Sequence, residues 1–155
     1  DWATLMSAGS PYAPRLRSER GVVVLRDGRI VAFGGFDQNL YQQNDVYSSD
    51  DGGATWSVVV TSAPWSSRGG FASVVGVDGS ILLFGGWANS TTSYNDVWRS
   101  ADGGSNWRQL TSSANWTARS GHGGAVLPRG TLLIVGGRSD SLGTSCYSDV
   151  YSSET

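Results

Sequence analysis

Short apolar segments recur along this chain, separated by polar, glycine-rich stretches. Residues 70–77 read GFASVVGV, residues 80–86 read SILLFGG, and Asp78-Gly79 lies between them. An Asp-Gly pair between apolar segments is a β-hairpin signal, and strands that are apolar at successive positions are typically buried on both faces. A polar stretch, a third segment (NDVWRS), a turn and a fourth segment follow, at 87–94, 95–100, 101–105 and 106–112. We therefore predict a unit of four short antiparallel strands.

The unit is repeated. The spacing is 51 residues, both from Gly34 to Gly85 and from Gly85 to Gly136. Other marks recur with it: Arg17, Arg68 and Arg119; Trp56 and Trp107; Trp65 and Trp116; and Asp45-Val46-Tyr47, which returns as Asp96-Val97-Trp98 and, after two inserted residues, as Asp149-Val150-Tyr151. Four-stranded units of about 50 residues, repeated and buried on both faces, predict the blades of a β-propeller.

The order of these marks resembles the Kelch repeat. The double glycine after the second strand, the Asp-Val-aromatic strand and the spaced tryptophans carry the resemblance, which covers essentially the whole chain. It implies an all-β, Kelch-like propeller with three blades' worth of four-stranded antiparallel sheets. Such a piece is half of a six-bladed ring or a fragment of a larger propeller.

The turn before the fourth strand carries a second resemblance. SSDDGGATW (48–56) and RSADGGSNW (99–107) are similar to the Asp-box of sialidase-type propellers, through Ser49, Asp51, Gly53 and Trp56 and through Ser100, Asp102, Gly104 and Trp107. We expect a structural role, because an aspartate in such a turn accepts bonds from backbone N–H groups and a glycine takes a positive φ. A calcium site is the alternative, but one turn offers too few oxygens for that ion.

The repeat divides the chain into blades. We expect one propeller unit over 1–155, with blade 1 at 17–67, blade 2 at 68–118 and blade 3 at 119–155 without its last strand. Residues 1–16 align with a fourth strand and crossover, since Trp2 matches Trp107 and Leu5 matches Leu110. They are expected to complete a blade whose other strands lie in a second copy or in the rest of a longer polypeptide.

Composition excludes several classes of function. Charged residues make up 15% of the 155 residues, the net charge is −2 and no basic tract is present, so nucleic acid is not an expected partner. No apolar run approaches the length that spans a membrane. The single cysteine, Cys146, excludes an internal disulfide and a cysteine-based zinc site. We expect no metal and no cofactor.

Recognition is expected on the side of the variable loops and crossovers. The crossovers bring tryptophans and a repeated arginine there, and the residue three positions after each arginine varies. Differing residues on a common framework are typical of binding sites, although a repeated arginine also fits a role in fastening one blade to the next. The candidates for a binding face are Arg17, Arg20, Trp65, Arg68, Phe71, Trp87, Trp116, Arg119 and His122.

Two sequons, at Asn89 and Asn115, lie in predicted loops. N-linked glycans require such exposed positions in a secreted protein. The sequons predict an extracellular glycoprotein, either secreted or at the cell surface. A cytoplasmic Kelch scaffold is the alternative.

Three classes of function stay open at this point. A non-catalytic propeller for protein interaction or extracellular structural assembly needs nothing beyond the visible features. A lectin is the alternative, with aromatic rings stacking on sugars. An enzyme is disfavoured. The only glutamates, Glu19 and Glu154, poorly supply a sialidase-like site, and one His122 with one Cys146 does not supply a copper-radical oxidase site.

Overall fold

The computed structural model describes residues 18–89, 92–139 and 145–153, and every element among them is a β-strand. Sheet 1 consists of β1 (Gly21–Val24), β2 (Ile30–Phe33), β3 (Val46–Ser49) and β4 (Ser57–Val60). Sheet 2 consists of β5 (Ala72–Val75), β6 (Ile81–Phe84), β9 (Val97–Ser100) and β10 (Arg108–Thr111). Sheet 3 consists of β11 (Gly123–Val126), β12 (Leu132–Val135) and β13 (Val150–Ser152).

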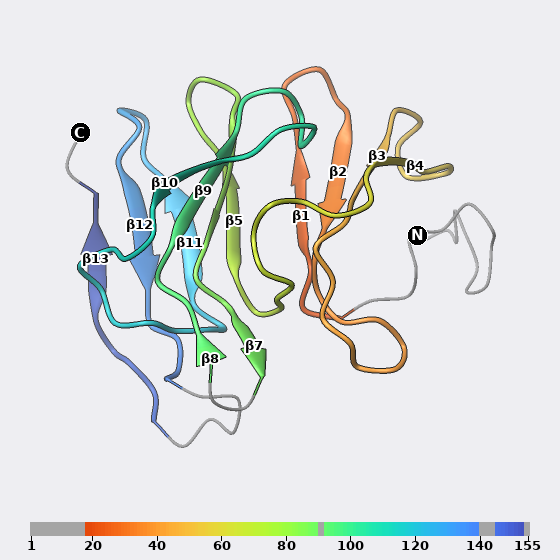
Figure 1. The fold of residues 1–155 in the computed structure, drawn as a ribbon. Coiled ribbons are helices and arrows are strands. Elements are labelled where there is room, and N and C mark those ends of the chain that lie inside the picture. Colours follow the sequence, from red (N-terminus) through yellow and green to blue (C-terminus); the bar gives the residue numbers. More distant parts are fainter. Residues whose placement is uncertain (1–17, 90–91, 140–144, 154–155) are drawn as a thin grey trace, which may run out of the picture.

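All three sheets are antiparallel meanders that stand side by side, as the blades of a partial propeller do (Figure 1). The first strands are the inner ones, since β5 lies against both β1 and β11. The predicted all-β, Kelch-like fold is therefore confirmed. Among the described residues, no helix has the length and apolar composition needed to span a membrane.

Part of the segment predicted as a polar loop forms an additional hairpin. Strand β7 (Trp87–Asn89) pairs with β8 (Thr92–Ser93) in a separate two-stranded sheet. The pairing is anchored at its base, because the backbones of Trp87 and Gly69 exchange two hydrogen bonds of 3.0 Å. The polarity of this segment therefore did not exclude strand pairing, which uses backbone groups only.

The core lies between neighbouring sheets. Every residue of β6 is buried, which agrees with its unbroken apolar sequence ILLF. Among the described residues, sheet 2 has a neighbour on each side, whereas sheets 1 and 3 each have one. Large apolar side chains on the outer two sheets accordingly stay exposed, among them Val22, Val24, Val135 and Val150.

The two ends of the sheets differ in character (Figure 1). The β1–β2, β5–β6 and β11–β12 turns and the Asp-Gly-Gly turns, β3–β4 and β9–β10, lie at one end, which we call the turn side. The β2–β3 loop, the β7–β8 hairpin and the segments that cross to the next sheet reach the other end, which we call the loop side.

Candidate functional site

The two Asp-Gly-Gly turns are closed networks of hydrogen bonds. The buried Ser49 hydroxyl donates to the Asp51 carboxylate over 2.8 Å and accepts from the Gly53 N–H over 2.8 Å. The same carboxylate accepts from the backbone N–H and the hydroxyl of Thr55. Hydrogen bonds from Thr55 and then from Ser49 lower the pKa of Asp51 to about 2.

The second turn repeats this network, with an asparagine in place of the threonine. Ser100 donates to Asp102 and accepts from the Gly104 N–H, and Asn106 donates twice to Asp102. Each turn also bonds its own tryptophan, since the Trp107 indole N–H donates to the Gly104 carbonyl over 2.9 Å. The aspartates are thus held within their turns, which gives these residues a structural environment.

The repeated arginines form clamps that fasten the end of each crossover onto the sheet that follows it. Arg68, 1% exposed, precedes β5 and reaches across sheet 2 to Asp96, with 2.9 Å between Nη2 and Oδ2. Its guanidinium also donates to the carbonyls of Ser66 and Gly85 over 3.0 Å each. The Tyr94 ring lies 3.8 Å from Cζ, a cation–π distance. All of these contacts are within the protein, so the Arg68 side chain has the environment of a structural residue.

Arg119 makes the same clamp one repeat later. It donates to the carbonyls of Thr117 and Gly136 and forms an ion pair with Asp149. The hydrogen bond to that carboxylate is the main cause of the raised pKa of Arg119, and it correspondingly lowers the pKa of Asp149. Arg17, the third member of this set, lies outside the described residues.

Four further binding-face candidates are packed between sheets. Trp65 lies in the core cluster of sheets 1 and 2, and Trp116 lies in that of sheets 2 and 3. Phe71 stacks on Phe33, with 5.6 Å between ring centroids. His122 occupies the equivalent place one repeat later, 5.7 Å from Phe84 and 6.0 Å from Trp116. Their assignment to recognition stays a prediction, and their surroundings are those of core residues.

A polar cluster at the loop side brings the three repeats together. The Glu19 carboxylate accepts from the Trp87 indole N–H over 3.0 Å, and its other oxygen lies 3.8 Å from Nη2 of Arg138. Phe36 packs against Trp87 with 4.8 Å between centroids. Phe36, Trp87 and Arg138 occupy equivalent positions in successive repeats, so one carboxylate connects three blades. We call Glu19, Phe36, Trp87 and Arg138 the loop-side cluster.

The backbone of Glu19 is strained. Its φ is 52°, whereas the equivalent residues, Gly70 and Gly121, adopt φ of 60° and 61°. The left-handed region is unfavourable for a residue with a Cβ. The Gly70 N–H donates to the Glu19 carbonyl, and the Gly121 N–H donates to the Gly70 carbonyl. These hydrogen bonds hold the conformation in place. A strained residue that is held by its surroundings is typical of functional positions.

Because Gly70 has no side chain, it leaves room for the side chains of Trp87 and Glu19 to meet. A Cβ at Gly70 would lie 3.0 Å from the Trp87 indole nitrogen and 3.1 Å from the Glu19 carboxylate. The side chains of Glu19 and Arg138 are 37% and 34% exposed, so the cluster is open to a ligand. Arg20, the remaining candidate, is also exposed beside it.

The β2–β3 loop presents apolar side chains at the same end. Leu40 and Tyr41 are 74% and 67% exposed, and Leu40 adopts a positive φ of 62°. The loop is nevertheless ordered by Asp37, whose carboxylate accepts from the N–H groups of Asn39 and Tyr41 and from the Gln43 amide. A fixed loop thus displays two large apolar side chains to solvent.

The sequence candidates therefore divide into two groups. Among the described ones, Trp87 and Arg20 lie at the loop side, whereas the two clamp arginines, Trp65, Trp116, Phe71 and His122 are buried. The sequence analysis did not include four residues of this end among its binding-face candidates: Glu19, Arg138, Leu40 and Tyr41. Glu19 had a detectable signal, because it interrupts a column that is glycine in the other two repeats.

Comparison with known proteins agrees with this architecture. The family model described as the KLHDC2/KLHL20/DRC7 Kelch-repeats domain matches residues 1–155. The "Dynein alpha chain, flagellar outer arm" of Chlamydomonas reinhardtii is 30% identical over 151 residues, which cover 88% of this chain and 3% of that relative. The chain thus spans a small part of the curated relative that it matches.

The chain belongs to the Kelch-repeat domain family. It is a protein-interaction propeller module of a generally non-enzymatic family.

The strain at Glu19 can be measured with two substitutions that both remove its carboxylate. We expect Glu19→Gly to be more stable than Glu19→Ala by about 1 kcal/mol, because only glycine adopts φ near 52° without strain. Urea denaturation of both variants checks this. Equal stability would show that the left-handed conformation is not strained.

The buried imidazole predicts a pH dependence of stability. Burial is the main cause that lowers the pKa of His122 to about 4 from 6.5; the Phe84 backbone acts in the opposite direction, and the charge of Arg119 adds a smaller lowering of the pKa. Neither ring nitrogen has a hydrogen-bond partner among the described residues. Because the unfolded chain binds the proton more tightly, stability from this group is complete above pH 6.5 and is lost as the pH falls toward 4.

We expect the loss to reach up to about 3 kcal/mol, the free energy that corresponds to this pKa difference. His122→Phe, which restores the residue type of Phe71, is expected to flatten the stability profile between pH 6.5 and 4. Denaturation across this pH range checks it. An unchanged slope in His122→Phe would assign the pH dependence to other groups.

Proposed function

We propose that this module binds its protein partner through the loop side, at the loop-side cluster and the β2–β3 loop. The observation that carries the proposal is the strained Glu19, whose side chain lies between Trp87 and Arg138 where the other repeats have glycine. A stable fold has no need for this strain, since glycine fits the position.

The chemistry of this surface suits a polypeptide segment. A basic side chain of the partner can pair with Glu19 and lie against the Trp87 ring, and a carboxylate can pair with Arg138. Leu40 and Tyr41 supply exposed apolar area near the same end, and aromatic and arginine residues are enriched in protein interfaces. We propose no reaction, because these residues lack a nucleophile activated by a neighbouring base.

The location is a separate proposal. The two sequons support a secreted or cell-surface protein, and Asn115 is exposed. The description of the relative as a flagellar outer-arm chain supports the alternative, a cytoplasmic scaffold. Mass spectrometry of Asn89 and Asn115 in protein from its native source decides between them, since unmodified asparagine at both positions removes the support for an extracellular location.

Selection from a random peptide library tests the loop side directly. We expect the selected peptides to lose at least about tenfold in affinity with Trp87→Ala and with Tyr41→Ala, as interface anchors do. Val77→Ala is the matched control, because Val77 is an exposed apolar residue at the turn side and its replacement leaves affinity unchanged. Melting temperatures of all variants confirm that folding is retained.

Two outcomes would contradict the proposal. Peptides that lose affinity with Val77→Ala but not with the loop-side variants would place binding at the other end. Selective binding on a glycan array that depends on Trp87, without any peptide binding, would favour the lectin alternative.

A further inference from the structure

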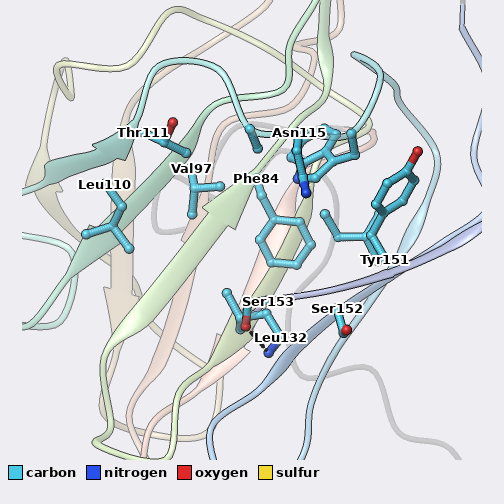
Figure 2. Close-up of a pocket in the computed structure, with 12 residues that line it drawn as sticks. Phe84, Val97, Leu110, Thr111, Asn115, Leu132, Tyr151, Ser152 and Ser153 are labelled. Atoms are coloured by element: carbon cyan, nitrogen blue, oxygen red, sulfur yellow. Dashed lines mark hydrogen bonds between the residues drawn. The ribbon is translucent and has the colours of Figure 1, made fainter. Parts of the chain in front are cut away.

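Leu40 and Tyr41 are the most exposed large apolar side chains among the described residues, at 74% and 67%. Most of the others lie on strands. Leu110, for example, lies on β10 and lines the open space between sheets 2 and 3 (Figure 2). Leu40 and Tyr41 instead belong to the β2–β3 loop, so no open face of a sheet accounts for their exposure.

The fold does not require large apolar residues in this loop. In the first repeat, residues 36–43 read FDQNLYQQ. The corresponding residues of the second repeat, 87–94, read WANSTTSY, with no large apolar residue between the two aromatic ends. A segment of this length can therefore connect the second and third strands without the exposed pair.

The backbone of Leu40 is held in an unfavourable conformation. Its φ is 62°, which is strained for a bulky residue and unstrained for glycine. The Leu40 N–H donates to the Asp37 carbonyl over 2.9 Å, and the Asp37 N–H donates to the Tyr41 carbonyl over 3.0 Å. These bonds close the turn around Leu40. A strained residue whose side chain is exposed to solvent gains little packing in return, which is typical of positions retained for function.

The Asp37 carboxylate fixes the conformation of this turn. One of its oxygens accepts from the N–H of Asn39 over 2.9 Å and from the N–H of Tyr41 over 3.0 Å. The other oxygen accepts from the Gln43 amide over 3.0 Å. Because Asp37 directly follows Phe36, the turn begins at the loop-side cluster.

We propose that Leu40 is the apolar anchor of the loop-side interface and that Asp37 is its positioning residue. The partner is a polypeptide segment that carries apolar side chains next to a basic one. Its apolar side chains cover Leu40 and Tyr41, and its basic side chain pairs with Glu19. This inference rests on the proposed function, because it assigns the chemistry of the partner at the same surface.

Both halves of this surface are prepared for such a segment. A side chain on a fixed turn loses little conformational freedom on binding, and a few buried anchors carry most of the binding energy of an interface. One Glu19 oxygen accepts from Trp87, whereas the other lies 3.8 Å from Nη2 of Arg138. A charge-assisted hydrogen bond measures about 2.7–2.9 Å, so the second oxygen has room for a closer cation.

Two replacements of Leu40 separate binding from stability. Peptides are selected from a random library against the unmodified chain and serve as the probe. Leu40→Gly and Leu40→Ala both remove the anchor, and we expect each to weaken peptide binding by at least about tenfold. Only glycine relieves the strain, so Leu40→Gly is expected to raise the melting temperature by about 2–4 °C, whereas Leu40→Ala is not. A purely structural role would not make one variant more stable and a weaker binder.

The positioning role of Asp37 has its own pair of variants. Asp37→Ala removes the acceptor of both loop N–H groups, and we expect it to weaken binding of the same peptides by about tenfold. Asp37→Asn keeps an acceptor oxygen and is expected to stay within about threefold of the unmodified chain. Equal affinity for Asp37→Ala and the unmodified chain would remove the positioning role.

The selected peptides test the chemistry of the partner. We expect them to share apolar residues next to a lysine or arginine. Replacing that basic residue with alanine should weaken binding to the unmodified chain and have little effect on binding to Glu19→Gln, as a double-mutant cycle requires. Peptides that bind equally well without a basic residue would contradict the assignment of the partner.

The Trp87→Ala variant distinguishes failure of this inference from failure of the proposed function. Affinity that falls with Trp87→Ala and stays unchanged in both Leu40 variants would overturn the inference and leave the proposed function in place. Affinity that stays unchanged with Trp87→Ala and with Tyr41→Ala would contradict the proposed function, and the inference with it.

Discussion

The buried ion pair between Arg68 and Asp96 is the interaction on which the arrangement of the sheets depends. Arg68 ends the crossover from sheet 1, and Asp96 immediately precedes the third strand of sheet 2, β9, so the pair fastens the end of that crossover onto sheet 2. A buried guanidinium is tolerated only when its donors are satisfied, and the Ser66 and Gly85 carbonyls complete the set. The ion pair therefore fixes the position of the crossover against sheet 2, in addition to any contribution to the free energy of unfolding.

The clamp also positions the groups at the loop side. The Arg68 carbonyl accepts from the Gly35 N–H, and Gly69 pairs with Trp87 immediately afterwards. Asn44 holds the start of the crossover by donating to the carbonyls of Ala63 and Trp65. The crossover is therefore fixed at both ends. The backbone exchange between Gly69 and Trp87, which recurs as Ser18 with Phe36 and Ser120 with Arg138, brings Trp87 within reach of Glu19.

The sequence predicted the features that repeat. The 51-residue spacing, the double glycines and the Asp-Val-aromatic strand depend on backbone geometry that each blade must satisfy, so they recur as a pattern. Gly35 is an example, because a Cβ there would lie 2.5 Å from the Ser18 carbonyl oxygen. Such constraints apply to each repeat, so the residues that satisfy them can be recognised from the sequence alone.

The loop-side cluster could not be predicted in the same way. It joins residues of three repeats that lie more than fifty positions apart, and only their packing brings Glu19, Trp87 and Arg138 together. The burial of His122 was equally hidden, since the repeat placed it among the binding-face candidates but did not say whether its side chain faced solvent. Differences between repeats marked these positions, and the structure gave them a role.

A double-mutant cycle on Arg68 and Asp96 tests the central claim most directly. Urea denaturation of Arg68→Met, Asp96→Asn and the double variant gives the coupling free energy between the two side chains. If the pair clamps the sheets, each single variant loses about 3–5 kcal/mol, because it leaves a buried charged or polar partner unsatisfied, and the double variant loses little more than either one. Additive losses, or single losses below about 1 kcal/mol, would contradict the account.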